Sequence, residues 1–176
     1  MKVIETNFDG HRFRSRTEAR WAVFFKAAGI LYEYEKEGLV LDGDPYLPDF
    51  WLPDLELWLE VKGDQPTPEE YSLCARLAAT SGYGVMLAVG APNPKEQIFW
   101  LPPNPTSDDP LASAQYYLAD DRRNENEFWL IADDTAWFSI GPVTGPDHGK
   151  HPLVHTATKA GYDAARSARF EHGESG

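Results

Sequence analysis

The sequence predicts an α/β fold in which helices flank a mixed central sheet. Before residue 90, the order of periodic segments is a helix, three or four strands, a second helix and a further strand. The last of these strands, residues 83–89, is apolar nearly throughout. Such a run is typical of a central strand that is covered on both faces. We therefore expect an α/β sandwich of about 90 residues.

The composition indicates one folded domain without membrane contact. The 176 residues are 42% hydrophobic and include six Trp, eight Tyr and nine Phe, enough for a buried core. No run approaches the roughly 18 apolar residues that span a bilayer, and residues 1–6 lack the apolar stretch of a secretory signal. The single cysteine, Cys74, excludes an intramolecular disulfide and a cysteine-based zinc cluster. We expect a cytoplasmic protein.

A first helix is expected over residues 16–28. Ser15-Arg16-Thr17-Glu18 has the form of a capping box, with Ser15 as the N-cap and Glu18 as the third helical residue. Apolar residues follow at mostly helical spacing, and Gly29 is typical of a helix end.

Short strands follow this helix. Residues 31–35 alternate as a strand, and residues 38–41 favour a second strand that is closed by turn residues. Residues 46–52 and 57–62 then favour a hairpin around the loop Pro53-Asp54-Leu55-Glu56.

The register of this hairpin places three polar side chains together. With a four-residue loop, Trp51 faces Trp58 and Asp49 faces Glu60. Because side chains alternate along a strand, Glu60 and Lys62 share a face with Asp49. Two opposed carboxylates repel, so this geometry calls for a cation between them. The alternative is an ordinary cross-strand salt bridge between Lys62 and one of the two acids.

A second helix is expected after this hairpin. Thr67 is its N-cap, Pro68 its first residue and Glu70 the acidic partner in a capping box. Cys74 falls on the apolar side of this helix, so we expect it to pack in the core, and Gly82 ends the helix.

Residues 96–176 are expected to form a C-terminal extension, a β-hairpin plus a helix, on a core of residues 1–95. The elements expected there are a strand over 98–101, a turn of helix near 112–118, a hairpin of 128–132 with 135–140, and a helix around 154–170. The alanine-rich face of the last helix favours docking on the protein over contact with nucleic acid.

The net charge of −12 argues against strong long-range attraction to nucleic acid. A local exception lies near the N-terminus, where four arginines fall close together with His11 beside them. Of these, Arg14, Arg16 and Arg20 are candidate phosphate contacts. A solvated, charged helix face is the alternative. We expect weak non-specific DNA affinity, or delivery to DNA by a partner.

Glu18 on an N-terminal helix, Pro48-Asp49 and Glu60-Val61-Lys62 together resemble the motif of the PD-(D/E)XK nuclease superfamily. The resemblance covers roughly residues 11–90. The expected order of elements is also similar to the restriction-endonuclease-like core of that superfamily. The segment 46–50 with Arg14 to Ala19 is similar to small phage and mobile-element nucleases, and closest to TnsA-like transposon endonucleases and resolvase-like enzymes.

The resemblance implies a metal centre. Asp49 and Glu60 would ligate Mg²⁺, for which Mn²⁺ can substitute, with the backbone carbonyl of Val61 as a further ligand. Lys62 would orient or help to deprotonate the attacking water. Glu18 would be a more distant partner of the metal or a ligand of a second metal, although its capping role alone also explains a glutamate there. Mg²⁺ prefers one or two carboxylates together with waters and phosphate oxygens, which agrees with these roles.

The function that the resemblance implies is metal-dependent hydrolysis of DNA phosphodiester bonds by a phage or mobile-element endonuclease. One chain would hold one active site, so cutting both strands would need a homodimer or a protein partner. The alternative is a nuclease-fold protein that acts by binding, such as an acidic phage inhibitor or assembly factor. The acidic charge favours this alternative, whereas the intact Asp49, Glu60 and Lys62 favour the enzyme.

Overall fold

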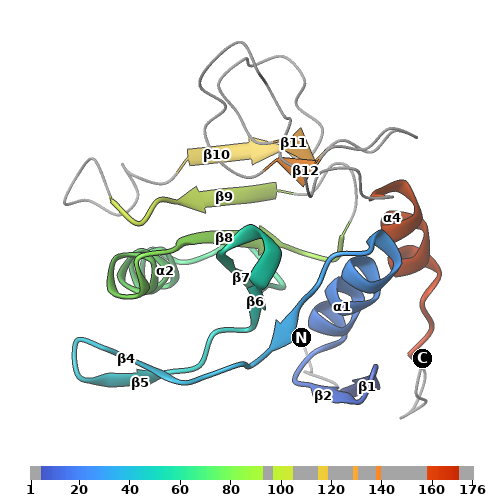
Figure 1. Ribbon diagram of the computed structural model, residues 1–176, viewed down its shortest axis with the longest axis horizontal. Coiled ribbons are helices and arrows are strands. Elements are labelled where there is room, and N and C mark those ends of the chain that lie inside the picture. Colours follow the sequence, from blue (N-terminus) through green and yellow to red (C-terminus); the bar gives the residue numbers. More distant parts are fainter. Residues whose placement is uncertain are drawn as a thin grey trace. The chain divides into compact units, whose positions relative to one another are not determined.

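In the computed structural model, the described residues are 5–92, 97–104, 115–118, 129–130, 138–139 and 158–170. They form a mixed α/β structure with three α-helices and a mixed sheet (Figure 1), which confirms the expected fold class. The finer assignment, a restriction-endonuclease-like core, stays a prediction.

The chain divides into two compact units that interleave along the sequence, and each is described by itself. Unit 1 comprises residues 1–31, 91–96 and 118–176, and unit 2 comprises residues 32–90 and 97–117. The expected division into a core of residues 1–95 and an extension of residues 96–176 stays a prediction.

Unit 2 is built on a mixed sheet with the strand order β10-β9-β8-β7-β6-β3. Strands β7 and β8 are parallel, whereas β3–β6, β6–β7 and β8–β9 are antiparallel. The bounds are β3 Glu33–Tyr34, β6 Phe50–Leu52, β7 Leu57–Lys62, β8 Gly84–Val89, β9 Gln97–Leu101 and β10 Gln115–Leu118.

The β6–β7 hairpin has the expected register. Its pairs are Phe50 with Leu59, Trp51 with Trp58, and Leu52 with Leu57. The connection is the 3₁₀ turn η1 (Pro53–Leu55) followed by Glu56, which has a left-handed φ of 50°. The four-residue loop therefore fixes which side chains of the two strands face each other.

The expectation of one continuous strand over residues 46–52 is wrong. The structure has β5 (Asp44–Tyr46), which pairs with β4 (Leu39–Leu41) in a separate two-stranded sheet, and then β6 from Phe50 onward. Pro48 has no backbone N–H that could donate a hydrogen bond to a neighbouring strand. The N–H of Asp49 donates to a side chain instead of to a neighbouring strand.

The core of unit 2 lies between this sheet and α2 (Pro68–Ser81). The expected capping box is present, since Thr67 and Glu70 exchange hydrogen bonds around Pro68. The buried cluster includes the expected Cys74, and its members are Leu41, Trp51, Trp58, Tyr71, Cys74, Leu77, Ala78, Val85, Leu87 and Leu101. The helix therefore covers the sheet face that carries Trp58, and by strand alternation also Glu60 and Lys62.

Unit 1 contains α1 (Arg16–Ala28), which has the expected bounds. Ser15 caps its first turn, and Gly29 ends it with a left-handed φ of 72°. A hairpin of β1 (Thr6–Phe8) and β2 (His11–Phe13), which was not expected, precedes the helix.

The last helix, α4 (Thr158–Ser167), packs along α1 within unit 1 (Figure 1). The rings of Phe24 and Tyr162 lie 4.9 Å apart, and a Cβ atom at Gly161 would come within 2.7 Å of Phe24. Glycine therefore permits the close approach of the two helices. The packing of this helix on the protein is as expected, but the helix ends at Ser167 rather than near residue 170. Residues 154–157 of its expected range lie outside the described residues.

The other expectations for the C-terminal segment have mixed outcomes. Residues 115–118 form strand β10, so the turn of helix expected there is wrong for these residues. Strands β11 (Trp129–Leu130) and β12 (Phe138–Ser139) pair antiparallel and lie within the expected hairpin. The remainder of that hairpin lies outside the described residues.

None of the helices in the described part of the chain has the length and apolar character needed to cross a membrane.

Candidate active site

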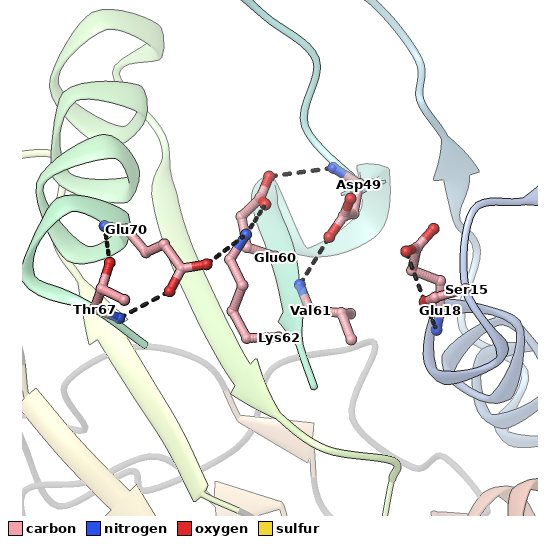
Figure 2. Close-up of polar contacts among 8 residues, drawn as sticks. All are labelled: Ser15, Glu18, Asp49, Glu60, Val61, Lys62, Thr67 and Glu70. Atoms are coloured by element: carbon pink, nitrogen blue, oxygen red, sulfur yellow. Dashed lines mark hydrogen bonds and ion pairs between the residues drawn. The ribbon is translucent and has the colours of Figure 1, made fainter. Parts of the chain in front are cut away.

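Asp49 and Glu60 lie buried beside each other, next to the β6–β7 ladder (Figure 2). Asp49 is 6% exposed and Glu60 is 2% exposed. The N–H of Asp49 donates to Oε1 of Glu60 at 3.2 Å, and the N–H of Val61 donates to Oδ2 of Asp49 at 2.9 Å. Each carboxylate thus accepts a backbone N–H of the opposite strand segment, and these contacts fix both side chains.

The backbone around these acids is anchored from both sides. The carbonyl of Asp49 accepts the N–H of Glu35 at 2.9 Å, and the carbonyl of Lys62 accepts the N–H of Gly90 at 2.7 Å. Strand β7 also pairs along its whole length with the parallel strand β8. The polar side chains therefore project from rigid backbone, as a preorganised site requires.

The ammonium of Lys62 lies between two acidic side chains. Its Nζ lies 3.7 Å from Oε2 of Glu60 and 3.8 Å from Oε1 of Glu70, and its side chain is 23% exposed. Burial alone would lower the pKa of Lys62, but attraction by Glu60 and Asp49 outweighs burial and raises it. Lys62 is therefore a cation at neutral pH. The salt bridge considered as an alternative to a metal site is present, and it joins Lys62 to Glu60.

The donor set fits a hard divalent cation that keeps part of its water shell. Asp49 and Glu60 bring two buried carboxylates together, and the single ammonium of Lys62 offsets only one of their two negative charges. Carboxylate oxygens are the ligands that Mg²⁺ prefers, and it commonly takes only one or two of them. Among the described residues, no group of three or more His, Cys, Asp or Glu side chains forms a complete protein cage. The ligand role of the Val61 carbonyl stays a prediction.

Tyr46 is a neighbour of the site that sequence reasoning missed. It ends β5, outside the hairpin, and its phenol makes a side-chain hydrogen bond to Glu60. Burial, followed by the charge of Glu60, raises its pKa far above the usual 10.0. The phenol is therefore a hydrogen-bond donor to the Glu60 carboxylate. The one available signal was its place in the segment Tyr46-Leu47-Pro48-Asp49.

The raised pKa of Tyr46 predicts a stability change at alkaline pH. Above about pH 10, the unfolded chain releases the phenol proton whereas the folded chain keeps it, so the free energy of unfolding falls as pH rises. Tyr46→Phe removes this contribution. Above about pH 10, we therefore expect the free energy of unfolding of the variant to fall by about 1 kcal/mol less per pH unit than that of the wild type. Urea denaturation between about pH 9 and about pH 11 measures the slope. Tyr83→Phe, with a side chain already exposed, is the matched control. Equal slopes in the wild type and Tyr46→Phe would contradict the prediction.

Glu18 lies in unit 1, where its capping role is evident. It is 7% exposed, and its carboxylate accepts the Ser15 hydroxyl at 2.7 Å and the N–H of Arg14 at 3.2 Å. Ser15 Oγ in turn accepts the N–H of Glu18 at 3.1 Å (Figure 2). The cap differs from the expected box, since Glu18 reaches back to Arg14. Asp49, Glu60 and Lys62 belong to unit 2, so a joint role with Glu18 stays a prediction.

The three candidate arginines differ in their surroundings. Arg14 is exposed, and Arg16 is partly buried. Within the described part of the chain, Nε of Arg16 is buried without a hydrogen-bond partner. Arg20 donates from Nη1 to the carbonyl of Ala165 at 2.6 Å and stacks on Phe170 at 6.0 Å, so it joins α1 to the α4 region. Contact of these arginines with nucleic acid stays a prediction.

A scan against protein-family models found no match to this chain, and searches of curated proteins and of solved structures found none either.

Proposed function

We propose that this protein is a Mg²⁺-dependent endonuclease that hydrolyses DNA phosphodiester bonds at a site formed by Asp49, Glu60 and Lys62. The observation that supports this most is the buried pair of carboxylates. Each accepts a backbone N–H, and the Lys62 ammonium lies 3.7 Å from one of them. A phage or mobile-element enzyme of the PD-(D/E)XK kind is part of the proposal, as the sequence motif suggests.

Asp49 and Glu60 would hold the metal, with the Val61 carbonyl beside them. When bound, Mg²⁺ would lower the pKa of a coordinated water and offset negative charge on the phosphate. Fixed carboxylates suit this task because their orientation is set before the substrate arrives. Their burial also strengthens electrostatic interactions at the site, since the local dielectric constant is low.

Lys62 would act as a hydrogen-bond donor to the attacking water or to a phosphate oxygen. Its raised pKa keeps the ammonium protonated at neutral pH, which favours an orienting role over removal of a proton. The ammonium would also offset the charge that develops on the phosphate in the transition state. Partial exposure of the side chain leaves a substrate a route to it.

Binding without cleavage is the second candidate function, and the net charge of −12 favours it. An acidic surface weakens attraction to the phosphate backbone, so DNA would be held mainly by local contacts. Under the enzyme proposal, Arg14, Arg16 and Arg20 would provide such contacts, and a homodimer or a protein partner would bring the protein to DNA. Under the alternative, an inhibitor or assembly factor would use the same fold without turnover.

The test of the proposal is a cleavage assay on plasmid, single-stranded and branched DNA. Each substrate is incubated with purified protein in Mg²⁺, in Mn²⁺ and in excess EDTA. Glu60→Gln keeps an amide oxygen to accept the Asp49 N–H while it removes the charge. Glu69→Gln makes the same change at an exposed position in the first turn of α2 and is the matched control. We expect cleavage by the wild type and Glu69→Gln with either metal, and none by Glu60→Gln or in EDTA.

Two outcomes would count against the proposal. Cleavage that persists in Glu60→Gln at the wild-type rate would place the activity elsewhere. DNA binding without cleavage of any substrate, by protein whose fold is intact, would support the second candidate function.

A further inference from the structure

Glu70, in the first turn of α2, makes two contacts with its two carboxylate oxygens (Figure 2). Oε2 accepts the N–H of Thr67 at 2.8 Å, which is the acidic half of the capping box. Oε1 lies 3.8 Å from Nζ of Lys62. The residue that completes the helix cap therefore also faces the candidate active site.

The ammonium of Lys62 lies between two carboxylates that come from different elements. Glu60 approaches it from β7 at 3.7 Å, and Glu70 approaches it from α2 at 3.8 Å. A lysine side chain has a long flexible stem, so one ion pair leaves the ammonium many orientations. A second carboxylate on another element restricts those orientations.

The position of Glu70 is itself fixed by the cap. Its N–H donates to Oγ1 of Thr67 at 3.3 Å while its carboxylate accepts the Thr67 N–H, so backbone and side chain are both held. Pro68 stiffens the same turn of the helix. The carboxylate therefore presents Oε1 to Lys62 from a rigid helix end.

We propose that Glu70 is a positioning residue for Lys62. It holds the ammonium beside Glu60 in the orientation from which Lys62 contacts the attacking water or the phosphate. This inference rests on the proposed nuclease function, and it assigns to the capping glutamate a second role that the cap does not require.

Two substitutions separate the capping role from the positioning role. Glu70→Gln keeps a side-chain oxygen for the Thr67 N–H, because glutamine also completes a capping box, but it removes the negative charge that faces Lys62. Thr67→Ala removes the hydroxyl that accepts the Glu70 N–H, but alanine keeps the backbone N–H that donates to the Glu70 carboxylate. The first variant tests the ion pair, and the second tests the cap.

The experiment uses the full chain. It measures kcat and KM for cleavage of plasmid DNA in Mg²⁺, and separately the midpoint of urea denaturation. We expect Glu70→Gln to lower kcat about tenfold, with KM and the urea midpoint close to wild type, since loss of a residue that orients another costs this much. We expect Thr67→Ala to lower the urea midpoint while kcat is retained. Glu69→Gln, which changes a neighbouring exposed glutamate, is expected to match the wild type in all three quantities.

The remaining outcomes separate the inference from the proposed function. If the wild type cleaves DNA and Glu70→Gln has an unchanged kcat, the positioning role is overturned and the proposed function stands. If Glu70→Gln and Thr67→Ala lose kcat in proportion to their loss of stability, Glu70 is only a helix cap. If the wild type cleaves no substrate, the proposed function is overturned and this inference with it.

Discussion

Asp49→Asn is expected to lower the rate of DNA cleavage by roughly 1,000-fold, because it would remove a proposed metal ligand and with it several kcal/mol of transition-state stabilisation. Asparagine keeps an oxygen that can accept the Val61 N–H, so the local backbone contact at 2.9 Å remains available. The negative charge of Asp49 is lost, however, and with it part of the attraction that a divalent cation would find at the site. The measurement is the initial rate of plasmid cleavage in Mg²⁺.

The same substitution is expected to leave the metal-free protein as stable as the wild type, or more stable by about 1 kcal/mol. Asp49 and Glu60 are both buried, and removing one of two close negative charges relieves their repulsion. Urea denaturation in EDTA measures this effect, and Asp54→Asn, exposed in η1, is the matched control. Wild-type cleavage by Asp49→Asn, or a large loss of its stability in EDTA, would contradict this prediction.

Lys62→Met is expected to lower the cleavage rate by roughly 100-fold, since it removes the proposed hydrogen-bond donor to the attacking water or to a phosphate oxygen. It is also expected to destabilise the metal-free protein by about 1–2 kcal/mol, because the buried Glu60 loses the cation 3.7 Å away. Methionine keeps most of the apolar stem, so packing changes little. Cleavage rates in Mg²⁺ and urea denaturation in EDTA measure the two effects.

The control for Lys62→Met is Lys26→Met, which removes a lysine from the solvent-exposed ion pair with Asp9. Exposed pairs contribute little, so this variant is expected to stay within about 1 kcal/mol of the wild type. The substitutions at Asp49 and Lys62 are thus both expected to lower the cleavage rate, whereas only Lys62→Met is expected to lower the stability of the metal-free protein. A rise in stability for Lys62→Met would show that the charges at Asp49 and Glu60 do not govern this site.

The features that sequence patterns predicted well depend on local interactions. The bounds of α1 follow from a capping serine, helical spacing of apolar residues and a terminal glycine, all of which lie within one segment. The register of β6–β7 follows from a short loop, because a four-residue connection leaves little freedom in the pairing. The proximity of Asp49, Glu60 and Lys62 followed from that register.

The strand assignments that failed are those in which the hydrogen-bond partners of the backbone are not set by the local sequence. The Asp9-Gly10 pair is a turn signal, yet strands of three residues around it carry too few alternating apolar residues to stand out. Pro48 and the side chain of Glu60 interrupt what reads as one strand over 46–52. The Gln115–Leu118 segment lies beside β9, and pairing there overrides its local preference.

Two neighbours of the site were missed because their contacts are not local. Tyr46 reaches Glu60 from a strand that pairs with β4 rather than with the hairpin, and no spacing rule relates the two residues. Glu70 was recognised as a cap, which explained it fully at the level of sequence. Only the path of the chain from β7 into α2 brings its second oxygen to Lys62.

Direct measurement of metal binding tests whether Asp49 and Glu60 form a divalent metal site. Mn²⁺ is titrated into the purified protein, and free Mn²⁺ is followed by electron paramagnetic resonance for the wild type, Asp49→Asn, Glu60→Gln and the control Asp54→Asn. We expect one bound Mn²⁺ per chain at millimolar concentrations for the wild type and Asp54→Asn, and loss of that ion in the other two variants. Undiminished binding in Asp49→Asn and Glu60→Gln, or no binding by the wild type, would contradict this expectation.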